Sequence, residues 1–352
     1  MLYKRPNPHG GDVYLNDIEL DFSASINPLG TPDAVKDAVR TAAERLDRYP
    51  DPYCGALVRA LAQAHGLPAE YVLCGNGAAE LIYSFCDAVR PAAAVETAPT
   101  FGEYAQALQK HRCRIARYPL RAETGFLPDE GLAGFVAAED PDVLFLCNPN
   151  NPTGRLMPMK LMKELLALCA RRNIRVFMDE CFLDLATGGE SLAGLLREYP
   201  CLIILKAFTK TYAVPGLRLG YCLSADPALL GRMAGTVQPW NVSVPAQAAG
   251  IAALGEREYA DRSRQYIAAG RAQQIAGLRA LGFEVCPSEA NFILFRGPVG
   301  LDKKLLSQRI AVRNCANFPG LSEGWYRIAV RTEEENDRLI AALKSITNGQ
   351  RA

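Results

Sequence analysis

The feature that most constrains the fold is an alternation of apolar runs and amphipathic stretches between about residues 55 and 225. Runs with strand character, such as VLFLC (143–147), CLIIL (201–205) and GYCLS (220–224), alternate with stretches of helical periodicity such as residues 158–172. Parallel strands need long crossover connections, which are usually helices. The order therefore predicts an α/β fold, with a mostly parallel sheet sandwiched by helices.

The rest of the chain predicts an arm and a second domain. Residues 1–30 are rich in Pro, Gly and Asn and lack helical periodicity, so we expect an N-terminal arm without an evident partner in its own subunit. Residues 31–250 should form a large domain, although residues 31–45 should contribute in part to the small one. Residues 251–352 should form a small α+β C-terminal domain. A cleft between the two domains is the expected place for a site.

Composition and charge exclude several classes of function. Lys and Arg number 39 against 38 Asp and Glu, and this net charge of +1 gives no reason to expect nucleic acid or an anionic membrane as a partner. No apolar run reaches the roughly 18–20 residues that span a bilayer, and the opening residues lack a signal segment, so we expect a cytoplasmic protein. Three scattered histidines and the absence of C-x-x-C argue against a metal site, and the 11 cysteines are expected to be reduced.

The segment KAFTKTYAVPGLRLGY (206–221) carries the strongest chemical signal. It follows an apolar run, so it should lie at the carboxyl end of a strand, where open α/β sheets bind ligands. Lys210 and Arg218 are eight residues apart, with Pro215-Gly216 forcing a turn between them. A lysine amine can bond covalently to an aldehyde, and a guanidinium binds phosphate through two parallel hydrogen bonds. The segment resembles the lysine segment of the fold-type I pyridoxal 5'-phosphate (PLP) enzymes.

That resemblance implies PLP as the cofactor, with Lys210 bonded to its aldehyde and Arg218 on its phosphate. Three further segments match in the order that the superfamily requires. Asp179 ends the run IRVFMDE and matches the aspartate that pairs with the pyridinium nitrogen. Asn151, in NPNNPTG, matches the asparagine that donates to the phenolate oxygen. The turn GNGAAE (75–80) should begin a helix at Gly77 and Ala78, whose N–H groups would face the phosphate.

Further cofactor and substrate contacts follow from the same resemblance. Phe101 matches the aromatic residue that stacks on the pyridine ring, with Tyr104 as the alternative. Tyr49 matches a tyrosine that reaches the cofactor phosphate of the neighbouring subunit, which implies a homodimer with shared active sites. Arg327 matches the arginine that binds the substrate α-carboxylate. Because Arg331 is only four residues away, a plain surface pair of arginines is the alternative interpretation.

One departure concerns the cofactor phosphate. Relatives commonly carry a serine where this chain has Ala207. Thr209, two residues later, is expected to supply the missing hydroxyl.

Within the superfamily, the chain is most similar to the histidinol-phosphate aminotransferase branch, and there to the threonine-phosphate decarboxylases of cobamide biosynthesis. The matching segments are HGG (9–11), DFSASINPLG (21–30), DECFLD, QPWNVS and VRNCANFPGL. In the aminotransferases, position 182 is usually a tyrosine, whereas this chain has Phe182.

The resemblance implies decarboxylation of a phosphorylated amino acid, O-phospho-L-threonine or O-phospho-L-serine. A histidinol-phosphate or related aminotransferase is the alternative, with a different reaction on the same scaffold. Arg313, joined by His9 and by Asn27 of the arm, is expected to bind the substrate, with Arg313 and His9 at its phosphate. No metal is expected.

Overall fold

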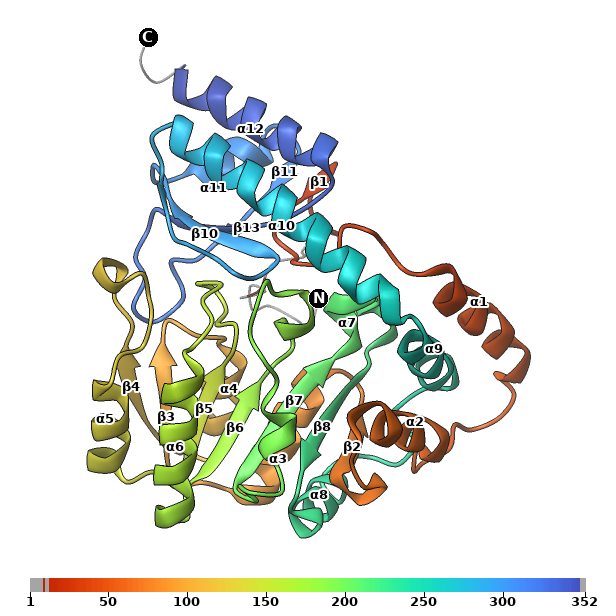
Figure 1. Ribbon diagram of the computed structural model, residues 1–352. Coiled ribbons are helices and arrows are strands. Elements are labelled where there is room, and N and C mark those ends of the chain that lie inside the picture. The colour runs from red at the N-terminus through yellow and green to blue at the C-terminus, as the bar shows by residue number, and fades with distance from the viewer. Residues whose placement is uncertain (1–8, 10–12, 349–352) are drawn as a thin grey trace.

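The computed structural model describes residue 9 and residues 13–348, and Figure 1 shows a large domain below a small one. The large domain contains a seven-stranded sheet in the order β2-β8-β7-β6-β5-β3-β4. Its strands are β2 (Val72–Gly75), β3 (Ala93–Ala98), β4 (Arg114–Pro119), β5 (Val143–Cys147), β6 (Arg175–Asp179), β7 (Leu202–Ala207) and β8 (Gly220–Ser224). Strand β8 runs opposite to the other six strands. The predicted mostly parallel sheet is confirmed, and β4 is a strand that the sequence did not reveal.

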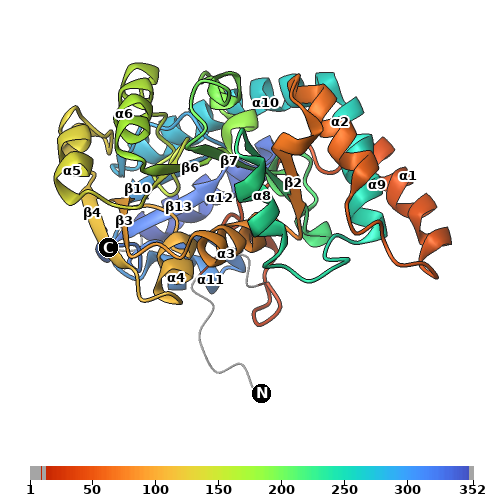
Figure 2. The same cartoon turned by 90° about the horizontal axis from the view of Figure 1, so that it is seen from below.

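Helices cover both faces of this sheet, as Figure 2 shows. The helices of the large domain are α1 (Asp33–Ala42), α2 (Gly55–His65), α3 (Ala78–Val89), α4 (Glu103–Gln109), α5 (Gly131–Glu139), α6 (Met159–Arg172), α7 (Phe208–Thr211), α8 (Pro227–Ala234) and α9 (Val244–Gly255). Alternate strand residues feed two separate cores: Leu144 and Ile204 pack into one, Phe145 and Ile203 into the other. This alternation follows from the opposite directions of successive side chains in a strand.

The small domain is built on an antiparallel sheet in the order β12-β13-β10-β9. Its strands are β9 (Glu284–Val285), β10 (Phe292–Arg296), β12 (Arg313–Asn314) and β13 (Trp325–Ala329), and its helices are α10 (Arg257–Ala280), α11 (Leu301–Leu306) and α12 (Glu333–Asn348). Helices α9 and α10 meet at Glu256, where the chain passes from the large domain to the small one.

Two expectations about the N-terminal part were wrong. The arm has a partner in its own chain, since β1 (Leu20–Asp21) pairs in parallel with β11 (Ile310–Ala311) of the small domain. Phe22, next to it, is fully buried in the core of the small domain. Helix α1 instead packs on α9, and its Val35 enters the core of the large domain. Residues 31–45 therefore do not extend the small domain, because their apolar face is covered by the large one.

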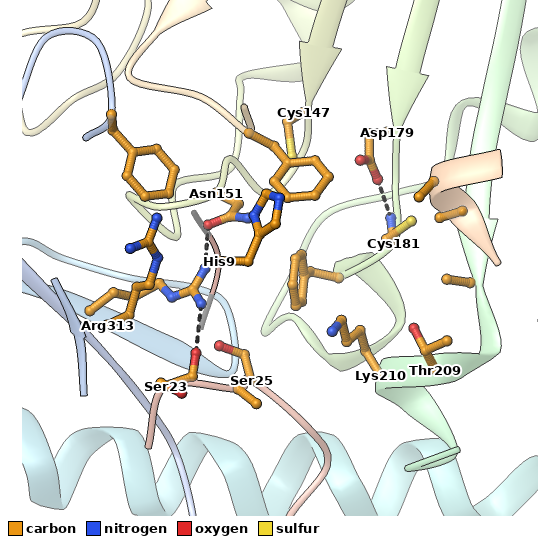
Figure 3. A pocket seen from close by; sticks show the side chains of 18 of the residues that line it. His9, Ser23, Ser25, Cys147, Asn151, Asp179, Cys181, Thr209, Lys210 and Arg313 are labelled. Atoms are coloured by element: carbon orange, nitrogen blue, oxygen red, sulfur yellow. Dashed lines mark hydrogen bonds between the residues drawn. The ribbon is translucent and has the colours of Figure 1, made fainter. Parts of the chain in front are cut away.

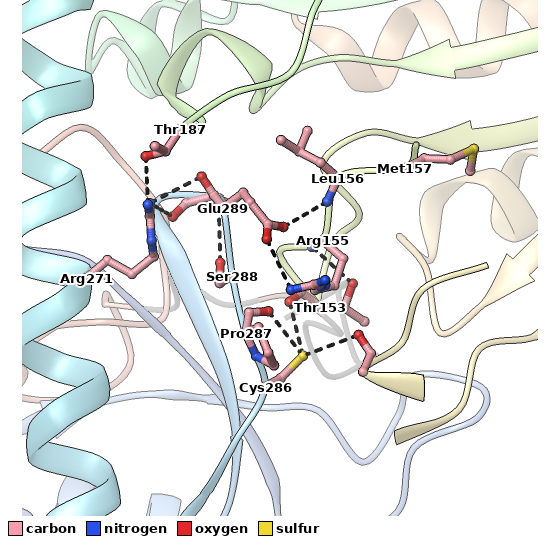
Figure 4. Close-up of polar contacts among 12 residues, drawn as sticks. Thr153, Arg155, Leu156, Met157, Thr187, Arg271, Cys286, Pro287, Ser288 and Glu289 are labelled. Atoms are coloured by element: carbon pink, nitrogen blue, oxygen red, sulfur yellow. Dashed lines mark hydrogen bonds and ion pairs between the residues drawn. The ribbon is translucent and has the colours of Figure 1, made fainter. Parts of the chain in front are cut away.

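A polar cluster joins the two domains beside the loop that follows Asn151 (Figure 4). Glu289, of the small domain, accepts hydrogen bonds from Arg155 Nη1 at 3.1 Å and from the Leu156 N–H at 3.0 Å. Its backbone N–H donates to Gly154 O, and its carbonyl accepts from the Thr187 N–H. Each of these hydrogen bonds is 2.9 Å long. These contacts fix the small domain against the loop that carries Asn151.

Membrane-spanning helices and metal-binding clusters are both absent from the described residues. No helix in residues 13–348 is long and apolar enough to cross a membrane. No group of three or more His, Cys, Asp or Glu side chains within the same residues could hold a metal ion. All eleven cysteines are free thiols.

Candidate active site

A cavity of about 230 Å³ lies between the two domains, at the carboxyl ends of β5, β6 and β7. Figure 3 shows Lys210 and Thr209 on one side of it and Arg313 on the other. Residues from the arm and from both domains form its walls: His9, Ser23, Ala24, Ser25, Ala78, Ala79, Phe101, Cys147, Asn151, Asp179, Cys181, Phe182, Ala207, Thr209, Lys210, Arg218, Arg313, Phe318 and Arg327. Ten of the thirteen predicted site residues are among them.

Lys210 occupies the short helix α7, directly after β7, so its amine points into the cavity from the end of a buried strand. Burial, together with the positive charges of Arg327 and Arg218, lowers the pKa of Lys210 to about 8. A neutral amine, which is the nucleophilic form, is therefore accessible near neutral pH. Lys206 lies outside this cavity, because its amine binds Asp184 at 2.7 Å and Glu180 at 3.6 Å.

Asp179 ends β6 and presents a buried carboxylate to the cavity. Its Oδ1 accepts from the Cys181 N–H at 2.9 Å, and its Oδ2 accepts from the Tyr104 hydroxyl at 2.6 Å. Burial raises the pKa of Asp179, while these donors and Lys210 lower it. A cationic ring nitrogen is the partner that would hold such a carboxylate in its charged form.

The beginning of α3 forms a cradle for an anion. Gly77 precedes the helix without a capping side chain, so the first N–H groups are open to a ligand. At Gly77 φ is +84°, and a Cβ atom there would lie 2.7 Å from Arg218 Nη2, so only glycine lets this guanidinium approach the turn. Thr209 is buried and lines the same cavity. This arrangement of a helix end, a hydroxyl and a guanidinium fits a phosphate.

Phe101, rather than Tyr104, faces the cavity, since Tyr104 is fully buried behind it. The two rings meet edge to face with centroids 5.6 Å apart. His9 lies beside Phe101, at 5.7 Å between ring centroids, and its Nε2 contacts Glu103 Oε1 at 2.5 Å. The aromatic surface for a planar ring is thus provided by Phe101.

Arg327, on β13, spans the gap between the domains. Its Nη1 donates to Asn151 Oδ1 and its Nη2 donates to Ser23 O at 2.9 Å. Its Nε, and likewise the hydroxyl of Ser25, is buried without a hydrogen-bond partner among the residues that the structure describes. Arg331 lies outside the cavity lining and pairs with Glu335 at 2.9 Å. Of the two arginines, Arg327 and not Arg331 is therefore placed to bind a carboxylate in the cavity.

Arg313, on β12, lies directly opposite Arg327 in the antiparallel pair β12–β13. Both side chains line the cavity. Burial lowers the pKa of Arg327 to about 10, and the positive charge of Arg313 also lowers it. The Arg313 guanidinium lies 5.1 Å from the Phe318 ring centroid and donates to Asn317 Oδ1 at 2.7 Å. Two facing cations in one wall favour an anionic ligand, since like charges opposite each other repel.

Two predicted residues lie away from the cavity. Asn27 is held in the wall behind it, where its amide donates to Thr211 O and Ser263 Oγ, each at 2.7 Å. We expected Asn27 to contact substrate, but its hydrogen bonds fix the arm instead. Tyr49 is 79% exposed, and its ring lies 4.7 Å from that of Trp240. It does not reach the cavity of its own chain.

Several lining residues had not been singled out from the sequence. Ser23 and Ser25 lie in the segment DFSASINPLG. The whole segment resembles relatives, but the resemblance does not single out either serine. Cys147 ends the apolar strand β5 and Cys181 follows β6, positions that are typical of core thiols. Phe318 was part of VRNCANFPGL, and only the folded loop brings it next to Arg313.

Comparison with known proteins places this geometry in a family. Residues 17–343 match the aminotransferase class I and II family. A threonine-phosphate decarboxylase from Salmonella typhimurium is 37% identical over 334 residues, which cover 94% of this chain and 92% of that protein.

Solved structures agree on the fold. The histidinol-phosphate aminotransferase from Clostridium acetobutylicum has a TM-score of 0.87 and 28% identity, covering 94% of this chain and 100% of its own. The histidinol-phosphate aminotransferase from Sinorhizobium meliloti, solved in complex with pyridoxal-5'-phosphate, has a TM-score of 0.84 and 25% identity, covering 95% of this chain and 92% of its own. The chain belongs to the aminotransferase class I and II family, and its cofactor is PLP.

Proposed function

We propose that this protein is a PLP-dependent lyase that decarboxylates an O-phospho-amino acid, O-phospho-L-threonine or O-phospho-L-serine, to the amino-alcohol phosphate. The observation that carries the proposal is the pair Arg313 and Arg327, directly opposed on β12 and β13 and lining one cavity. Such a substrate has two anionic groups, a carboxylate and a phosphate, which match two guanidinium groups. The 37% identity to a threonine-phosphate decarboxylase supports the reaction, and we further propose a cytoplasmic role in cobamide biosynthesis.

The residues present fit PLP as cofactor. We assign Lys210 to its aldehyde, Asp179 to its ring nitrogen and Asn151 to its phenolate oxygen. We assign the ring face to Phe101. The phosphate would occupy the cradle formed by Gly77, Ala78, Thr209 and Arg218, where the glycine turn leaves room and the helix supplies free N–H groups. When bound, PLP supplies an electron sink for the bond that breaks at the substrate Cα.

The substrate would be fixed at both ends. Arg327 binds the α-carboxylate, because its buried Nε lacks a partner among the described residues and can serve a ligand oxygen. The hydroxyl of Ser25, buried and without a partner among the same residues, is a second donor beside it. Arg313, together with His9, binds the phosphate. Anchoring both ends fixes which bond at Cα stands perpendicular to the cofactor ring, and this choice decides the reaction.

Phe182 supports decarboxylation over transamination. Its ring is buried against Phe292, with centroids 4.9 Å apart, and the Lys210 amine lies 5.8 Å from its centroid. Where aminotransferases of this branch usually have a tyrosine hydroxyl, this chain presents an apolar ring to the lysine. Lys210, with its lowered pKa, is the group placed to return a proton to Cα after carbon dioxide leaves.

We also propose that the enzyme is a homodimer whose partner supplies Tyr49. Five large apolar side chains are exposed on one part of the large domain. Three lie in residues 46–53, one precedes α9 and one lies on α9: Leu46, Tyr49, Tyr53, Trp240 and Ile251. Exposed aromatic residues grouped in this way are typical of an interface between subunits. Because Tyr49 lies outside the cavity of its own chain, it can serve a site only across such an interface.

Product analysis tests the proposed reaction. The purified protein, loaded with PLP, is incubated with one of three substrates: O-phospho-L-threonine, O-phospho-L-serine or histidinol phosphate. Each incubation also contains 2-oxoglutarate as amino-group acceptor. The proposal predicts an amine phosphate and carbon dioxide from at least one phospho-amino acid. A keto or aldehyde product with glutamate, and no carbon dioxide, would assign the aminotransferase function that the structural relatives carry in their names.

A further inference from the structure

A buried tyrosine holds Asp179 from outside the cavity lining. Tyr104, on α4, is fully buried, and its hydroxyl donates to Asp179 Oδ2 at 2.6 Å. The Cys181 N–H donates to the other oxygen, Oδ1, at 2.9 Å. Each carboxylate oxygen therefore has its own donor from the protein, and the carboxylate cannot rotate without losing one of them. Its remaining lone pairs are left for a ligand in the cavity.

Packing in turn fixes the hydroxyl of Tyr104. Its ring is stacked on Phe145, with centroids 5.2 Å apart and an angle of 22° between the planes. It also meets Phe101 edge to face at 5.6 Å and 83°. Tyr104 thus contacts both the Phe101 ring and the Asp179 carboxylate. These two groups, which the cavity offers to a planar ring, therefore keep a fixed position relative to each other.

The surroundings of Asp179 make this donor important for its charge. The ionisable groups that face it are Tyr104, the thiols of Cys147, Cys181 and Cys222, and the Lys210 amine. Burial raises the pKa of all three thiols, so they are neutral near pH 7 and add no second negative charge beside the carboxylate. Stabilisation of that charge falls to Lys210 and to the donors from Tyr104 and Cys181.

We propose that Tyr104 is a positioning residue that fixes the Asp179 carboxylate, in its charged form, toward the ring nitrogen of the cofactor. The inference rests on the cofactor placement in the proposed function. It does not depend on whether the enzyme decarboxylates or transaminates, because both reactions need a protonated ring nitrogen as electron sink.

The test is Tyr104→Phe, which removes one oxygen and keeps the ring that stacks on Phe145. The readout is PLP affinity of the apoprotein, from absorbance titrations without substrate. Loss of a hydrogen bond to a buried charge should weaken PLP binding about tenfold or more. Because Asp179 then protonates more easily, the fall in affinity with acidity should begin about one pH unit higher than in the wild type.

A double-mutant cycle separates positioning from general damage. In an Asp179→Asn background the charge is already gone, so adding Tyr104→Phe should change PLP affinity by less than about twofold. The matched control is Tyr118→Phe, which removes another tyrosine hydroxyl that donates to a carboxylate, Asp129, outside the cavity. It should leave both affinity and pH profile unchanged, and the apoprotein Tm of each variant reports any loss of folding.

Three outcomes would overturn the proposal: an unchanged PLP affinity and pH profile in Tyr104→Phe, an equal loss in the Asp179→Asn background, or the same loss in Tyr118→Phe. A wild type that binds no PLP at all would instead contradict the cofactor placement. Failure of decarboxylation alone would leave the affinity result standing, so the two failures are distinguishable.

Discussion

Arg313 and Arg327 face each other across β12 and β13, so that two guanidinium groups share one wall of the cavity between the domains. On one face of an antiparallel pair, directly opposed side chains lie within about 5 Å at Cβ, and like charges in that position destabilise the sheet. A carboxylate and a phosphate from one substrate would remove that repulsion. The pair therefore favours a ligand that carries negative charge.

Replacing Arg313 should separate phosphorylated from unphosphorylated substrates. A desolvated arginine on a phosphate contributes about 2–5 kcal/mol, judged from losses when one partner of a buried charge pair is truncated. Arg313→Ala should thus lower kcat/KM for O-phospho-L-threonine by roughly 30-fold to several-thousand-fold, while the poor activity on threonine should hardly change. Arg296→Ala, at a 57% exposed arginine on the neighbouring β10, is the matched control and should change neither. Equal losses on both substrates would make Arg313 structural.

Lys210 should be the residue that carries the cofactor. Borohydride reduction of the holoenzyme, followed by peptide mapping, should place the pyridoxyl group on Lys210, because its pKa of about 8 makes the neutral amine accessible. Attachment of PLP to the apoprotein should accelerate as pH rises through about 8, since only the deprotonated amine attacks the aldehyde. Lys206 provides the internal control, as it is held charged by Asp184 and Glu180. A label on Lys206 would contradict the assignment.

The contacts of Glu289 predict a stabilising link between the domains. Glu289→Ala removes two hydrogen bonds to a carboxylate, one of them from Arg155, whose side chain is 16% exposed. The free energy of unfolding should fall by about 1–3 kcal/mol, measured by urea denaturation. Glu284→Ala, which loses only an exposed ion pair of 3.9 Å with Arg296, should cost less than about 1 kcal/mol. If both variants lose the same amount, Glu289 is not a link of this kind.

Subunit mixing tests the role assigned to Tyr49. Tyr49→Ala and Lys210→Ala should each be nearly inactive as homodimers. Mixed under conditions that allow subunits to exchange, they should recover activity, because one site of each heterodimer has an intact lysine and a tyrosine from the partner. A monomeric wild type with full activity at micromolar concentration, or mixtures that stay inactive, would refute shared sites.

Much of the central sheet, and the site residues at its edge, could be predicted because the apolar runs and the chemically active residues lie next to each other in the sequence. Strands β5 and β8 match the apolar runs residue for residue, since both are buried at every position and a strand covered on both faces is continuously apolar. Asp179 and Lys210 follow such runs directly, so the direction of the strand fixes which end of the sheet they reach. Strand β4 has no such run, because Arg114 and Arg117 interrupt its apolar residues at the edge of the sheet.

The parts that could not be predicted depend on pairing between distant segments. Nothing in residues 20–22 indicates that they pair with β11, because two residues carry too little periodicity to identify a strand. The opposition of Arg313 and Arg327 likewise depends on the register of β12 with β13, and β12 is only two residues long. Tyr104 appeared to be an alternative ring for stacking, and only the folded protein shows its hydroxyl on Asp179.

The most direct measurement follows both bonds at Cα in one experiment, with O-phospho-L-threonine that carries ¹⁴C in its carboxyl group and deuterium at Cα. Decarboxylation breaks the bond to the carboxyl group and leaves the original hydrogen in place. A decarboxylase should release ¹⁴C as carbon dioxide and form an amine phosphate that retains its deuterium. Loss of deuterium to solvent, with ¹⁴C retained in a keto acid, would rule out decarboxylation and assign transamination.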